Sequence, residues 1–129
     1  MHMDSKDKHQ TTKNNRLIQA MRHASVGVWS VLRHERNMRI HIFLGIIAVF
    51  LGILLQISIL EWLWIILAIF FVMISEFANT VAEALTDLIV KNNYDPIAKR
   101  IKDVSAGSVL MSAIFAVIVG ALIFLPKIF

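Results

Sequence analysis

Hydrophobic and polar residues are segregated along the chain, and their pattern predicts a polar tail followed by helices. Residues 1–15 show no apolar periodicity, so we expect a disordered or loosely attached tail. From Arg16 to His34, apolar residues fill one half of a helical wheel and mostly polar or basic residues the other, with Trp29 at the edge. This pattern is typical of an amphipathic helix lying in the headgroup plane of a membrane. A surface helix packed on its own protein would show the same pattern and stays an alternative.

Three long apolar runs follow, at about residues 40–60, 62–89 and 104–125. Each reaches the roughly 20 residues that a helix needs to cross a bilayer. Between the second and third runs, residues 91–96 predict a turn, and residues 97–103 a short polar helix. We expect Pro126 to stop the last span. The pattern therefore predicts an all-α integral membrane protein, with a surface helix at 16–34 and three spans in one domain, residues 16–129.

Composition and charge placement fix the expected compartment of each segment. With 57% hydrophobic and 17% charged residues, the chain lies outside the range of soluble globular domains. Twelve of the thirteen lysines and arginines fall in residues 6–39 or 91–102, and the last is Lys127. The positive-inside rule places both segments in the cytoplasm, hence the N-terminus inside and the C-terminus outside. This placement accounts for the net charge of +4 without a nucleic-acid partner.

Candidate chemistry is concentrated in the cytoplasmic half of the second span. At 100° per residue, Glu76, Asn79, Glu83 and Asp87 share one narrow stripe of the helix. Counted from Trp62 at about 1.5 Å per residue, Glu76 lies about 21 Å into a hydrocarbon core of about 30 Å. We therefore expect Glu76 to be buried, and Glu83 and Asp87 to emerge near the headgroups.

Carboxylates at this depth need cations, because an unpaired charge in a membrane costs several kcal/mol. The candidate cations are Arg36, Arg39, Lys102 and a bound metal. A site of oxygen ligands without cysteine suits Mg²⁺, which commonly binds one or two carboxylates together with substrate phosphates. A structural ion-pair network and a proton or ion pathway of the transporter kind are the alternatives.

Other signals are weaker. The chain has neither a P-loop nor a GxGxxG motif, and His23, His34 and His41 have no ligand-like spacing, which favours interfacial positions for them. In the third span, small residues recur every fourth position on one face, at Ser108, Ser112, Ala116 and Gly120. Such a stripe indicates close helix packing, and in so small a protein it favours oligomerisation.

Four segments of the chain resemble one known family, the small bacterial integral-membrane lipid kinases, which comprises diacylglycerol kinase and undecaprenol kinase. These segments are residues 35–41 (ERNMRIH), 76–83 (EFANTVAE), 94–99 (YDPIAK) and 102–107 (KDVSAG). The resemblance covers nearly everything from Arg16 to Gly120, and its ERN-x-RIH form is closer to the undecaprenol kinase branch. Two positions depart from the family pattern: Ala20-Met21 replaces the usual Ser-Phe of the surface helix, and Asp95 replaces a frequent histidine.

The resemblance implies a homotrimer in the bacterial cell (inner) membrane that transfers the γ-phosphoryl group of MgATP to a lipid alcohol at the cytoplasmic face. Undecaprenol is the expected acceptor; diacylglycerol is the alternative, and a small transporter is the alternative of another class. By position in the motifs, Glu76 resembles the general base, and Glu35 and Glu83 resemble the metal ligands. The implied nucleotide contacts are Arg16, His23, Asn79, Asp87, Asn93, Tyr94, Asp95, Lys102 and Asp103. The implied lipid contacts are Asn37, Arg39 and Ala106.

Overall fold

A computed structural model describes residues 13–129, which form four α-helices and, within that range, no strand. The helices are α1 (Lys13–His34), α2 (Arg36–Leu54), α3 (Ile59–Val90) and α4 (Pro96–Ile128). The all-α prediction is therefore confirmed for this part of the chain. Most of the predicted N-terminal tail lies outside the described residues, and residues 13–15 already belong to α1.

The chain divides into two units, Met1–His34 and Glu35–Phe129, and the first contributes α1. Apolar side chains of α1, among them Leu17, Ile18, Met21 and Trp29, are exposed to more than half of their possible extent. Arg16 and His23 are also exposed, and because they are seven residues apart they share a face of the helix. The location of α1 in the membrane surface stays a prediction.

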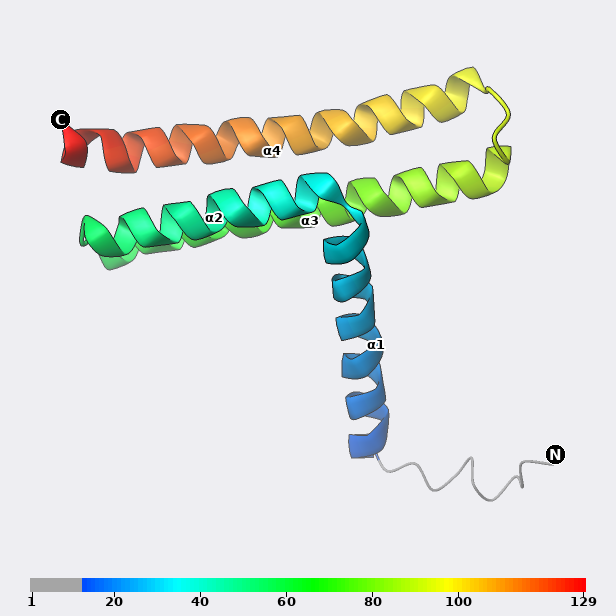
Figure 1. Cartoon of the computed structure of the whole chain (residues 1–129), viewed down its shortest axis with the longest axis horizontal. Coiled ribbons are helices and arrows are strands. Elements are labelled where there is room, and N and C mark those ends of the chain that lie inside the picture. Colours follow the sequence, from blue (N-terminus) through cyan, green and yellow to red (C-terminus); the bar gives the residue numbers. More distant parts are fainter. Residues whose placement is uncertain (1–12) are drawn as a thin grey trace. The chain divides into compact units, whose positions relative to one another are not determined.

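The second unit contains α2, α3 and α4, all long and apolar enough to cross a membrane. Figure 1 shows these three helices running alongside one another, with α3 leading through a tight turn into α4. The three predicted spans are confirmed as helices of that kind, although their ends differ. The first ends at Leu54 instead of about residue 60, and the predicted polar helix 97–103 is continuous with the third span.

Pro126 does not stop the last span, so that prediction was wrong: α4 continues to Ile128. Proline removes one backbone N–H donor and crowds the carbonyl one turn earlier, and both effects normally break a helix interior. Here the proline lies in the last turn, where little helix remains to be broken.

The turns at both ends of α3 are defined by local hydrogen bonds. At the start, Ser58 and Glu61 form a capping box in which each side chain binds the other's backbone N–H. Glu61 Oε2 also lies 3.3 Å from Lys127 Nζ, which ties the end of α4 to the start of α3. At the other end, Lys91 and Asn92 adopt positive φ angles of 48° and 66°, which end α3 before α4 begins.

The core of this unit lies along α3, which packs mainly against α4 and also against α2. Its buried members are Ile57, Ile65, Ala68, Val119, Ile123 and Phe124. On the α2 side, Gly52 permits a close approach, since a Cβ atom there would lie 2.7 Å from the ring of Trp62. Ser112, from the small-residue stripe of α4, is completely buried within this single chain. At Ser112, therefore, the stripe packs within the subunit.

We predict that the N-terminus and the 91–96 turn face the cytoplasm and that Phe129 faces outside. Three spans put the two ends of the α2–α4 unit on opposite sides of a membrane, and the basic residues select which side is inside. Accessibility of tags placed at residue 1, in the turn and after Phe129 measures this in intact cells and in inverted vesicles. Protection of the C-terminal tag in intact cells would contradict the orientation.

Candidate active site

The polar stripe predicted on α3 is present, and its burial falls toward the C-terminal end of the helix. Glu76 is 2% exposed and Asn79 is buried, whereas Glu83 is half-buried and Asp87 is exposed. Each lies three or four residues after the one before it, so all four lie on one side of α3. The burial of Glu76 and the exposure of Asp87 are as expected from the sequence, and the depth of the stripe in a membrane stays a prediction.

The buried end of this stripe contains polar atoms that lack hydrogen bonds. Within residues 13–129, three buried side-chain oxygens have no hydrogen-bond partner: Glu76 Oε1, Asn79 Oδ1 and Thr80 Oγ1. An unsatisfied buried polar atom costs about 1–3 kcal/mol, and more when it is charged. These three atoms lie within five residues of one helix, so polar groups without hydrogen bonds from the described residues are concentrated at this point of α3.

His41 of α2 lies against the buried carboxylate of Glu76. Its Nε2 atom lies 3.2 Å from Glu76 Oε1, an ion-pair distance. Glu76 Oε1 thus has an ion-pair contact with His41, although the geometry of that contact is not that of a hydrogen bond. Sequence spacing had indicated only an interfacial position for His41; its approach to Glu76 depends on how α2 packs on α3.

The antiparallel packing of α2 on α3 brings Glu35 toward Glu83. Gly52 lies against Trp62, and His41 lies against Glu76. Residues further along α3 therefore contact residues nearer the start of α2, which means that the two helices are antiparallel. Glu35 lies six residues, about 9 Å, before His41, and Glu83 lies seven residues, about 10 Å, after Glu76. Both are near enough to act electrostatically on Glu76. Three carboxylates are thus gathered at one end of the α2–α3 pair.

These three carboxylates suit a cation that takes only some of its ligands from the protein. Within the described residues, no group of three His, Cys, Asp or Glu side chains is placed to hold a metal ion by itself. Glu35, Glu83 and the unpaired Asn79 Oδ1 nevertheless offer oxygen ligands on adjoining helices. Mg²⁺ is commonly held by one or two carboxylates, with water and substrate phosphates completing its shell. The residues present are therefore compatible with Mg²⁺.

Lys102 links α4 to the exposed end of the stripe. Its Nζ atom lies 2.5 Å from Asp87 Oδ1, which supplies one of the cations expected from the sequence. Asp103 forms a separate pair with Lys99 on the surface of α4. Both pairs are solvent-accessible, and such pairs add little stability, which leaves their side chains available to a charged ligand.

The turn between α3 and α4 carries three more of the predicted nucleotide contacts. Asn93 and Tyr94 are exposed. Asp95 caps α4, its Oδ1 atom accepting hydrogen bonds from the backbone N–H groups of Ile97 and Ala98. The aspartate that replaces the family's frequent histidine thus has a structural role here.

The remaining predicted site residues are on three different helices. Asn37 and Arg39 are exposed in the first turn of α2, and Ala106 is exposed on α4. Arg16 and His23 belong to α1, in the other unit. Their roles toward lipid and nucleotide stay predictions.

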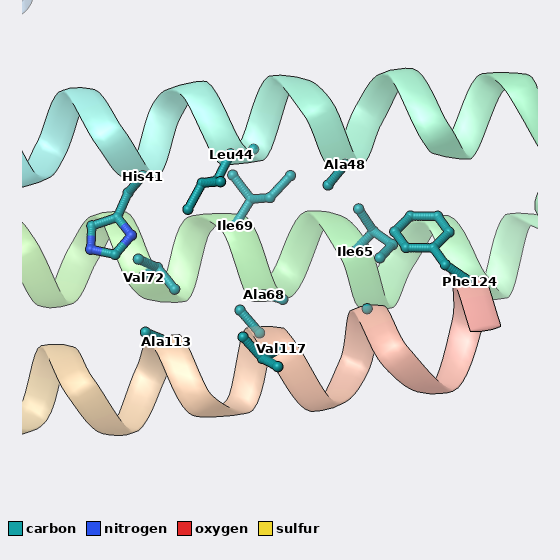
Figure 2. Close-up of a pocket in the computed structure, with 13 residues that line it drawn as sticks. His41, Leu44, Ala48, Ile65, Ala68, Ile69, Val72, Ala113, Val117 and Phe124 are labelled. Atoms are coloured by element: carbon teal, nitrogen blue, oxygen red, sulfur yellow. The ribbon is translucent and has the colours of Figure 1, made fainter.

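An apolar groove of about 270 Å³ leads to the Glu76 end of the site. Its wall is formed by α2 and α4 and its floor by α3, and its lining side chains are all apolar except His41. Figure 2 shows His41 at one end, pointing from α2 toward α3, and Phe124 at the other. The groove is therefore a hydrocarbon-lined space that ends beside a buried carboxylate.

A carboxylate stripe at the end of membrane helices, with a lysine at its exposed end and an apolar groove at its buried end, defines an enzyme-like site that faces both lipid and water. Comparison with known proteins identifies its class. The family model of prokaryotic diacylglycerol kinase matches residues 22–124. The chain belongs to this family, which confirms the prediction of a membrane lipid kinase and sets aside the transporter alternative.

Two relatives show the extent of the similarity. The undecaprenol kinase of Bacillus subtilis is 39% identical over 125 residues, which cover 97% of this chain and 99% of that protein. The diacylglycerol kinase of a Synechocystis species is 39% identical over 110 residues, covering 85% of this chain and 63% of that protein. The residues of the carboxylate stripe lie within the part matched by the family model.

Proposed function

We propose that this protein transfers the γ-phosphoryl group of ATP to undecaprenol at the cytoplasmic face of the membrane, giving undecaprenyl phosphate. The observation that carries the proposal is the buried carboxylate of Glu76, which lies beside His41 at the end of a hydrocarbon-lined groove. A long-chain alcohol presents one hydroxyl on an apolar body, which matches this arrangement. The 39% identity to an undecaprenol kinase over nearly the full chain supports this acceptor.

In the proposed reaction, Glu76 accepts the proton of the lipid hydroxyl. The hydroxyl oxygen then bonds to the γ-phosphorus while the bond to the β–γ bridging oxygen breaks, and ADP leaves. Mg²⁺ bound at Glu35 and Glu83 would supply the positive charge that phosphoryl transfer needs. Asp87, Lys102 and the 91–96 turn would face the water side, where ATP arrives, and the buried Asn79 lies on the stripe between them and Glu76.

We also propose that the working form is a homotrimer. The resemblance to the family supports it, and so do the three buried oxygens that lack partners within one chain. Arg16 and His23 on α1 would join the nucleotide site in that assembly. Many apolar side chains of α2–α4 are exposed in the single chain, which fits burial against lipid and neighbouring subunits.

The acceptor is tested by transfer of labelled γ-phosphate from ATP to lipid in detergent micelles. We expect a higher kcat/KM with undecaprenol than with diacylglycerol, and no transfer without lipid. A preference for diacylglycerol would assign that lipid as acceptor and phosphatidic acid as product. Transfer to neither lipid would contradict the proposed reaction.

We predict that Glu76→Gln lowers kcat about 10²- to 10⁴-fold, the usual contribution of a general base. Glutamine keeps the shape of the side chain and cannot accept the proton, so ATP binding and oligomeric state should be retained. The matched control is Glu61→Gln, because Glu61 lies at the opposite end of α3 in the capping box. A correctly assembled Glu76→Gln enzyme with near-normal kcat would exclude Glu76 as the base.

We predict that Glu35→Gln and Glu83→Gln each raise the Mg²⁺ concentration needed for half-maximal activity by about tenfold or more. Even residues that only support metal ligands contribute about 10- to 100-fold to affinity, so loss of a ligand should weaken binding at least as much. Activity is measured across a Mg²⁺ titration at saturating ATP, again with Glu61→Gln as control. Unchanged Mg²⁺ dependence in both variants would rule out this pair as the metal site.

A further inference from the structure

His41 lies both beside the buried Glu76 and at the end of the apolar groove. It lies on α2 with its side chain 21% exposed, and its Nε2 atom is 3.2 Å from Oε1 of the nearly fully buried Glu76. It is also the one residue able to bear charge that lines the apolar groove. Figure 2 shows its ring directed from α2 toward α3 at the end of that groove.

The contact with His41 gives the buried carboxylate of Glu76 a polar neighbour. A carboxylate in an apolar setting is costly to keep without a polar or charged neighbour. Glu35 and Glu83 repel Glu76 electrostatically, whereas His41 attracts it when protonated and can donate a hydrogen bond when neutral. A group on Oε1 also limits rotation of the carboxylate, which fixes the direction of its second oxygen.

We propose that His41 is a positioning residue, which holds Glu76 Oε1 from α2 and thereby directs the other carboxylate oxygen to the acceptor hydroxyl. This inference rests on the proposed role of Glu76 as base. His41 and Glu76 belong to different helices, so the packing of α2 on α3 is what places the base. A lipid lying in the groove has its polar end beside this pair.

The experiment compares His41→Ala and His41→Gln, each with Glu76 and with Gln at position 76. We expect His41→Ala to lower kcat about tenfold to 10²-fold, the cost of a misplaced reacting group, with the KM for ATP unchanged. His41→Gln should recover part of this loss, because its amide N–H can donate to Oε1. In the Glu76→Gln background, His41→Ala should cause no further loss, since no base remains to be positioned.

Two controls separate this effect from a structural one. His34→Ala removes another histidine, which belongs to α1 and not to the α2–α4 unit, and whose Nδ1 atom lies 2.8 Å from the Ser30 carbonyl oxygen. Melting temperature and oligomeric state are measured for every variant in the same detergent. A structural role would lower the melting temperature and reduce activity by the same factor in both position-76 backgrounds.

The results distinguish the positioning role of His41 from the role of Glu76 and from the proposed function. Normal kcat in His41→Ala, or equal and independent losses in the two backgrounds, would overturn the positioning role while leaving the proposed function intact. Near-normal kcat in Glu76→Gln would overturn the assigned base and the positioning role together. Absence of lipid phosphorylation by the unchanged protein would overturn the proposed function itself. A drop in kcat with unchanged ATP KM, partial recovery by glutamine and no effect without the base would support the inference.

Discussion

Burial of an ionisable carboxylate among packed membrane helices is the constraint on which the rest of the site depends. Glu76 is almost inaccessible, and one of its oxygens has no hydrogen-bond partner among the described residues. Such a group would be selected against if helix packing were its only role, because an apolar residue of similar size is cheaper to bury. Its presence on the central helix therefore requires neighbours that compensate its charge, and His41 is the one that the single chain provides.

Because α3 lies between α2 and α4, side chains of both neighbouring helices contact its polar stripe. On one side, α2 brings His41 and, further toward its start, Glu35. On the other, α4 brings Lys102 to Asp87, at the exposed end of the stripe. The small residues of α2 and α4, such as Gly45, Ala113 and Gly120, leave the groove open between them. One helix thus carries the buried carboxylate, and its two neighbours contribute a histidine, a lysine and most of the groove lining.

The sequence predicts the features that depend on one helix at a time. The three spans and the stripe from Glu76 to Asp87 follow from hydrophobic length and the 3.6-residue period, and the structure has both. The contact of His41 with Glu76 could not be predicted, because it depends on the register of α2 against α3. The continuous helix through residues 97–103 was missed for another reason: polar residues were interpreted as a boundary although nothing in them breaks a helix. Pro126 was misjudged because its effect depends on how much helix follows.

α3 is longer than a helix needs to be to cross a bilayer. Its 32 residues extend about 48 Å, whereas the hydrocarbon core of a bilayer is about 30 Å thick. Counted from Ile59, where the Ser58–Glu61 capping box lies beside Lys127, the C-terminal part of α3 projects beyond this thickness. Glu83 and Asp87 lie on that projecting part, and the pair between Asp87 and Lys102 joins it to α4. Along one side of this helix, the stripe therefore changes from the almost inaccessible Glu76 to the exposed Asp87, which is joined to α4.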